Sequence, residues 1–164
     1  MPFLLRKIRK SRWYRTARPS WLAAGCLQAD PLADLGTQEN KLSLWHVDDS
    51  KSNLDEVIVA LATNLEHTSD IGYALIDPQL LSKSGFQIQS SPGRTKHQTA
   101  GACWHYDVIE LSARRLVELA KLVMEHGETG RYSENTVIRL LEQATRKRVI
   151  NREDLEPDVA KKIP

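Results

Sequence analysis

Residues 41–76 read KLSLWHVDDSKSNLDEVIVALATNLEHTSDIGYALI, and this stretch decides the fold class. Residues 41–47 predict a strand, because apolar side chains occur on both of its alternating faces. Residues 53–65 follow with apolar residues at helical spacing, and residues 71–76 are an apolar run that is typical of a central strand. A strand, a helix and a strand within one such stretch have the length of a βαβ unit.

Three shorter signals follow this unit. The pair Asp77-Pro78 predicts a short helix over residues 78–83, because Asp is a good N-cap and Pro suits the first helical position. Residues 86–89 alternate between apolar and polar side chains, which predicts an edge strand with one face in water. Residues 90–100 are polar and have no period, which indicates a loop.

The remainder of the chain is predicted to be helical. A long helix is expected from about residue 102 to Gly127, and a second one over residues 134–147 with Ser133 as its N-cap. A last short helical piece is expected after Asn151. The concentration of strands before residue 90 and of helices after residue 100 predicts an α+β fold, with a small sheet of about three strands that contains the βαβ unit and a C-terminal helical layer.

The length of 164 residues predicts one domain. Within it we expect a basic N-terminal arm over residues 1–20, an α/β region with the sheet over residues 21–100, and a helical region over residues 101–164 that packs on the same core. Hydrophobic residues make up 41% of the chain, which excludes a wholly disordered protein.

Charge is distributed unevenly along the chain. Residues 1–29 contain seven Lys and Arg residues and no acid, although the net charge of the whole chain is only +2. Because the chain has 23 basic and 21 acidic residues, the part after residue 29 holds 16 basic and 21 acidic residues and is net negative. This asymmetry predicts a cationic arm on a mildly acidic body.

The arm is the first candidate binding site. Its basic residues would neutralise phosphates, and its two aromatic rings would stack on bases, a combination that suits single-stranded nucleic acid or RNA. The alternative is that the aromatic rings dock the arm on its own body or on a protein partner. The candidate residues are Arg6, Lys7, Arg9, Lys10, Arg12, Trp13, Tyr14 and Arg15.

Three carboxylates form the second candidate site. Asp48 and Asp49 follow the first predicted strand, and Asp77 follows the next. If these strands are parallel, the three side chains lie at the same edge of the sheet, where open α/β folds place their ligands. Such carboxylates would hold Mg²⁺ for phosphoryl transfer or nucleic-acid hydrolysis. The alternative is that they serve in a turn and as helix caps.

The run Gly101-Ala102-Cys103-Trp104 resembles part of the nucleophile motif of papain-type cysteine proteases. The resemblance implies a helix that begins at a nucleophilic Cys103. The match covers four residues, and Ala100 stands where the family has a cysteine. His126, a histidine further downstream, lies at the far end of the same predicted helix, beyond reach of Cys103. The alternative is a small buried thiol beside a core tryptophan.

Four residues near this motif form a further candidate metal site. The spacing of Cys103 and His105 places them on different faces of a helix, unlike the histidine pairs of zinc proteases. The set is His97, Cys103, His105 and Asp107.

These patterns leave three functional hypotheses. The first is a non-enzymatic binding or regulatory protein that acts by protein–protein contact, of the size of bacterial accessory, immunity or antitoxin proteins. The second is a nucleic-acid-binding protein that uses the basic arm, and the third is a Mg²⁺-dependent phosphoryl-transfer enzyme or nuclease. No apolar run approaches the roughly 18 residues of a membrane span, and Arg6 interrupts any secretory signal, so a cytoplasmic protein is expected.

Overall fold

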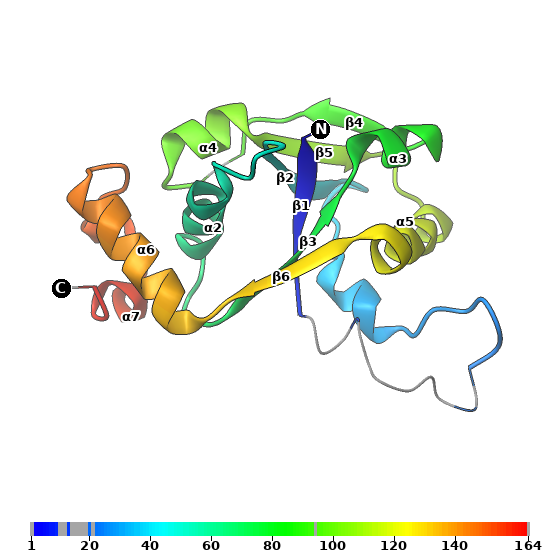
Figure 1. Ribbon diagram of the computed structural model, residues 1–164, viewed down its shortest axis with the longest axis horizontal. Coiled ribbons are helices and arrows are strands. Elements are labelled where there is room, and N and C mark those ends of the chain that lie inside the picture. The colour runs from blue at the N-terminus through cyan, green and yellow to red at the C-terminus, as the bar shows by residue number, and fades with distance from the viewer. Residues whose placement is uncertain (1, 10–12, 14–19, 21, 94, 164) are drawn as a thin grey trace.

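The computed structural model describes residues 2–9, 13, 20, 22–93 and 95–163. They form an α+β fold around a six-stranded sheet in the order β4-β5-β2-β1-β3-β6 (Figure 1). Every neighbouring pair of strands is antiparallel. The strands are β1 (Phe3–Ile8), β2 (Leu42–Val47), β3 (Ile71–Ile76), β4 (Gln87–Ser90), β5 (His105–Ile109) and β6 (Glu128–Tyr132).

Strand β1 lies in the interior of the sheet, between β2 and β3. Its residues Leu4 and Leu5 are 2% and 0% exposed, on opposite faces. The prediction of a basic arm over residues 1–20 is therefore wrong for its first part. Arg6 and Lys7 interrupt the apolar run Phe3-Leu4-Leu5, so the sequence does not show the continuous apolar pattern of a strand that is buried on both faces.

The predicted strand–helix–strand unit is present, but β1 lies between its two strands in the sheet. Strands β2 and β3 both run antiparallel to β1 and hence in the same direction, and helix α2 (Leu54–Ala62) connects them. The prediction of a sheet with about three strands is wrong, because the sheet has six: β1, β5 and β6 are three strands that the sequence patterns did not indicate.

The long helix predicted from residue 102 to Gly127 is interrupted by β5. Helix α4 (Gln98–Cys103) precedes this strand, and helix α5 (Ala113–His126) follows it, with the Ser112 hydroxyl accepting from the Arg115 N–H at 3.3 Å. Apolar side chains in β5 continue the helical spacing of α5, so periodicity alone could not separate the two.

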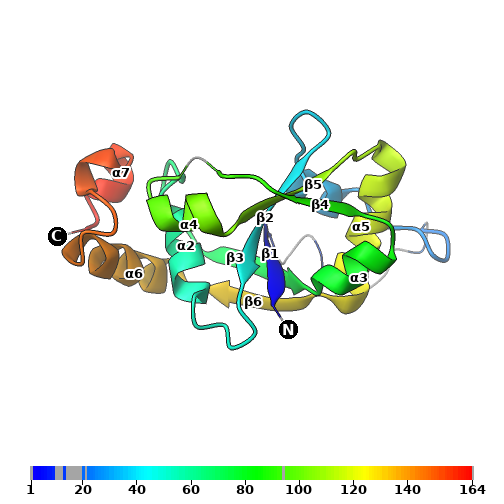
Figure 2. The ribbon, with the colours of Figure 1, turned by 90° about the horizontal axis from the view of Figure 1, so that it is seen from above.

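Helices cover both faces of the sheet and enclose two separate cores (Figure 2). Helices α2, α4 and α6 (Glu134–Arg146) lie on one face, while α3 (Pro78–Lys83), α5 and the 3₁₀ helix η1 (Asp30–Asp34) lie on the other. The predicted C-terminal helical layer is therefore divided between the faces. The chain ends with η2 (Arg152–Asp154) and α7 (Pro157–Ala160), whose neighbour Ile163 joins the first core.

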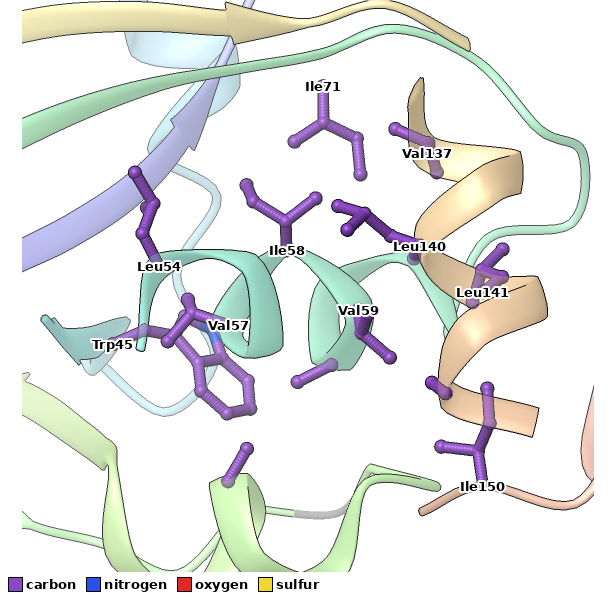
Figure 3. Packing of buried hydrophobic residues seen from close by; sticks show 14 of the residues in the cluster. Trp45, Leu54, Val57, Ile58, Val59, Ile71, Val137, Leu140, Leu141 and Ile150 are labelled. Atoms are coloured by element: carbon purple, nitrogen blue, oxygen red, sulfur yellow. The ribbon is translucent and has the colours of Figure 1, made fainter. Parts of the chain in front are cut away.

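Helix α2 packs between the sheet and α6 in the first core (Figure 3). Its residues Val57 and Ile58 are fully buried, and Val137 and Leu141 of α6 are equally inaccessible. The apolar face predicted for this helix is thus confirmed, although the helix ends at Ala62 and not at residue 65.

Helices α3 and α6 have the limits and caps that the sequence predicted. The Asp77 carboxylate accepts from the Gln79 N–H at 2.8 Å, and the Ser133 hydroxyl accepts from the Thr136 N–H at 3.3 Å. Strand β4 is an edge strand, as predicted. In the part of the chain that the structure describes, no helix has both the length and the apolar character needed to cross a membrane.

Candidate anion-binding site

Strands β1 and β2 are paired over only part of their length. Their register joins Phe3–Leu5 to Trp45–Val47, although β1 continues to Ile8 and β2 begins at Leu42. A cavity of about 640 Å³ lies beside this unpaired section. We call it the cationic cleft, and its lining residues are Arg6, Lys7, Ile8, Arg9, Ala33, Asp34, Gln38, Ser43, Trp45, Leu61, Asn64, Gly93 and His105.

Arg6 bridges the unpaired section. Its guanidinium donates to the Asp34 carbonyl at 3.1 and 2.7 Å and to the Ser43 carbonyl at 2.9 Å. Burial lowers the pKa of Arg6 to about 10, and the Asp34 charge opposes this shift. Arg6 therefore links β1 to both η1 and β2, and it contributes positive charge to the cleft.

Lys7 and Arg9 supply the other formal positive charges. Burial lowers the pKa of Lys7, and repulsion from Arg9 and Arg6 lowers it further, while Asp34 raises it. Arg9 is exposed, and its backbone N–H donates to the Asp34 carboxylate at 2.6 Å. Asp34 is the sole acid among the cleft residues that the structure describes, so three cations face one carboxylate.

Trp45 and His105 also line the cleft. Their rings meet edge to face with centroids 4.9 Å apart, and the His105 Nδ1 is hydrogen-bonded to the Ser91 carbonyl. Gly93 lies against the same ring, because a Cβ added there would be 2.7 Å from the His105 Cγ. This close approach requires glycine and fixes the position of His105.

The charge crowding predicts a pH dependence of anion binding. A bound anion stabilises the Lys7 ammonium and raises its lowered pKa, so binding takes up protons. The affinity for sulfate, which stays a dianion throughout, is expected to be about halved when the pH reaches the lowered pKa of Lys7 and to fall further above it. NMR titrations at three pH values check this, and Lys7→Arg should flatten the curve. An affinity that rises with pH would contradict the prediction.

The eight residues of the predicted arm site have different positions. Arg6, Lys7 and Arg9 line the cleft. Trp13 is 2% exposed, and its indole N–H donates to the Asp34 carboxylate at 2.9 Å, so it docks on the body and presents no ring for stacking. Lys10, Arg12, Tyr14 and Arg15 lie outside the described residues.

The carboxylates of the predicted Mg²⁺ site make the hydrogen bonds of turns and caps. Asp48 accepts from the Ser52 N–H at 2.7 Å and from both the Ser52 and Ser50 hydroxyls, and the bond from the Ser52 hydroxyl is the main reason that its pKa is lowered. Asp49 accepts from the Ser50 N–H at 3.1 Å, and Asp77 caps α3. Across the described ranges, no three His, Cys, Asp or Glu side chains are placed to hold a metal, the set around His97 and His105 included.

The structure also corrects both readings of Cys103. This residue is the last of helix α4 and is exposed, whereas the papain-type resemblance implies a helix that begins at the cysteine. The exposure equally contradicts the alternative of a buried thiol.

Apart from Arg9, sequence reasoning did not assign the cleft residues outside β1 to a common site, and it considered His105 only as a metal ligand. Asp34, Ser43 and His105 come from three separate elements, and no motif joins them in the chain. Only the local basic density around Arg6 pointed to this place. Comparison of the chain with protein-family models, with curated proteins and with solved structures finds no match.

Proposed function

We propose that this protein binds nucleic acid, with the phosphate backbone of a single strand in the cationic cleft. The observation that carries the proposal is the gathering of Arg6, Lys7 and Arg9 in one cavity of about 640 Å³ that has a single carboxylate among the lining residues the structure describes. Burial is the main cause of the lowered pKa of Lys7, and repulsion from Arg9 and Arg6 adds to it; a bound anion would offset that repulsion.

A polymer fits the charge distribution better than a small anion does. In the sequence, Arg9 is followed by Lys10, Arg12, Arg15 and Arg18, so the segment next to the cleft residues in the chain is rich in positive charge. A series of cations suits a repeating phosphate backbone, and each neutralised phosphate releases counterions. Exposed Asn64 and the partly buried His105 add hydrogen-bonding groups to the cleft.

The test is the affinity for a fluorescein-labelled 20-nucleotide single strand, measured by anisotropy between 50 and 300 mM KCl. In the variant Lys7→Gln/Arg9→Gln we expect at least a tenfold loss at about 100 mM salt, and a fall of about 1.4 in the slope of log affinity against log salt, since each lost contact removes about 0.7. Arg6 stays intact, because it also holds the fold together.

The matched control is Lys83→Gln/Arg114→Gln, which removes the same charge from exposed positions on α3 and α5. It should change the affinity less than twofold. Binding that is insensitive to salt, equal losses in both double variants, or an absence of binding by the parent protein would each overturn the proposal.

Protein–protein contact remains the second candidate, and one observation favours it. Strand β4 is an edge of the sheet, and its residues Gln87, Gln89 and Ser90 are exposed. An unpaired edge offers backbone groups to a partner strand. A regulatory protein of this kind would co-purify at native abundance with one protein in fixed stoichiometry, and Ile88→Pro would abolish that complex while leaving the binding of the single strand intact.

A further inference from the structure

The side chain of His97 is buried with one ring nitrogen unsatisfied. It is 2% exposed, and within the described part of the chain its Nε2 has no hydrogen-bond partner. Burying such a group without a partner is costly, and most buried polar atoms in native proteins are paired. An unpaired atom at this depth indicates that something else supplies the partner.

The other ring nitrogen determines what that partner must be. His97 is the N-cap of α4, and its Nδ1 accepts from the Ala100 N–H at 3.2 Å. A backbone N–H can only donate, so Nδ1 carries no proton, and the neutral ring holds its proton on Nε2. His97 is therefore a fixed donor toward its unsatisfied side, which excludes a role as general base through Nε2.

A small cavity lies on that side. Its volume is about 230 Å³, and its lining comes from α2, the N-terminus of α4 and the C-terminal half of α6. It shares no lining residue with the cationic cleft. Val59, Leu140 and Ala144 give it apolar walls, and Glu56 places its Oε2 at 3.9 Å from the His97 Nε2, too far for a direct hydrogen bond.

We infer that this cavity is a binding site for a small neutral lactam or carboxamide with a single ring. The carbonyl oxygen of such a group accepts from the His97 Nε2–H, while its adjacent N–H donates to the Glu56 carboxylate. The lining carries charges of both signs, from Asp55 and Glu56 and from Lys147, which suits a neutral polar group better than an ion, and an ammonium group has no lone pair for His97. The ring covers the apolar walls, and the volume, below the roughly 300–1,000 Å³ of drug-sized sites, limits the ligand to one ring.

The test uses uracil as the probe and 1,3-dimethyluracil as its matched analogue, which keeps the ring and both carbonyls and lacks the N–H donors. Binding is followed by NMR on protein with ¹⁵N-labelled histidine. We expect uracil to shift the His97 Nε2 signal, and 1,3-dimethyluracil to bind at least tenfold more weakly. His97→Asn should weaken uracil binding at least tenfold as well, because Asn retains an N-cap acceptor, while its shorter amide does not extend to the position of the Nε2–H.

A second variant keeps the test decisive if the histidine substitution disturbs the fold. The Glu56 side chain is 57% exposed, so Glu56→Leu is tolerated and should also weaken uracil binding tenfold. Glu66→Leu, at an exposed glutamate outside the cavity, should leave it unchanged. Equal binding of the two pyrimidines, no movement of the Nε2 signal, or full affinity in both variants would overturn the inference. This site is independent of the proposed nucleic-acid cleft, since Lys7→Gln/Arg9→Gln should leave the uracil titration unaltered.

Discussion

Deletion of residues 2–9 is expected to abolish the cooperative fold of the whole chain. These residues contain β1, which alone joins the strands β4-β5-β2 to the strands β3-β6. Its removal exposes the apolar surface of both cores and leaves two sheet edges unpaired. Circular dichroism and denaturant unfolding should show the loss of a single sharp transition.

The point variant Leu5→Ala should weaken the same strand by an amount that can be measured as a loss of unfolding free energy. Leu5 is 0% exposed, and truncating a fully buried leucine costs about 2–5 kcal/mol of unfolding free energy. The control Val149→Ala, at a side chain 39% exposed, should cost at most about 1 kcal/mol. Native-like stability after the deletion would mean that β1 is a dispensable arm and that the observed sheet order is not the stable one.

The second large effect is expected at Asp34. Its carboxylate accepts from the Arg9 backbone N–H and from the buried Trp13 indole N–H. Asp34→Ala leaves the indole donor unsatisfied in the core, which should lower the unfolding free energy by about 1.5–3 kcal/mol. Asp34→Asn retains an acceptor oxygen and should cost less.

A double-mutant cycle isolates the buried bond. In a Trp13→Phe background the indole donor is absent, so Asp34→Ala should cost at least about 0.5 kcal/mol less than it does in the parent chain. Equal costs in both backgrounds would show that Asp34 stabilises the protein through other contacts.

The sequence was most informative where local chemistry decides the structure. Helix α3 could be predicted from Asp77, Pro78 and Gly85 alone, and the Gly85 φ of 76° confirms that a left-handed residue ends the element. Helix α6 was equally clear from the Ser133 cap and its apolar stripe. In both cases the determining residues lie within one or two turns of each other.

The strands that were missed are those whose formation depends on distant partners. Strand β6 has the sequence ETGRY, which carries no apolar alternation, and it exists because it pairs with β3. Strand β1 contains Arg6, which is tolerated inside the sheet because carbonyls of Asp34 and Ser43, far along the chain, accept its hydrogen bonds. Neither partnership leaves a local trace in the sequence.

The candidate site shows the same division. The density of basic residues indicated Arg6, Lys7 and Arg9, but the other residues that line the cleft could be identified only from the tertiary structure. The expectation that Trp13 stacks on a ligand depended on an exposed arm, and the indole is instead part of a core.

The interior position of β1 also constrains how the chain is made. On the ribosome this strand is made before both of its partners, β2 and the later strand β3, which ends at Ile76. The sheet around β1 therefore cannot be completed until β3 has been translated. Until then, Leu4 and Leu5 lack part of the surface that buries them in the folded protein. The two adjacent cations, Arg6 and Lys7, would keep this segment soluble and discourage association between nascent chains.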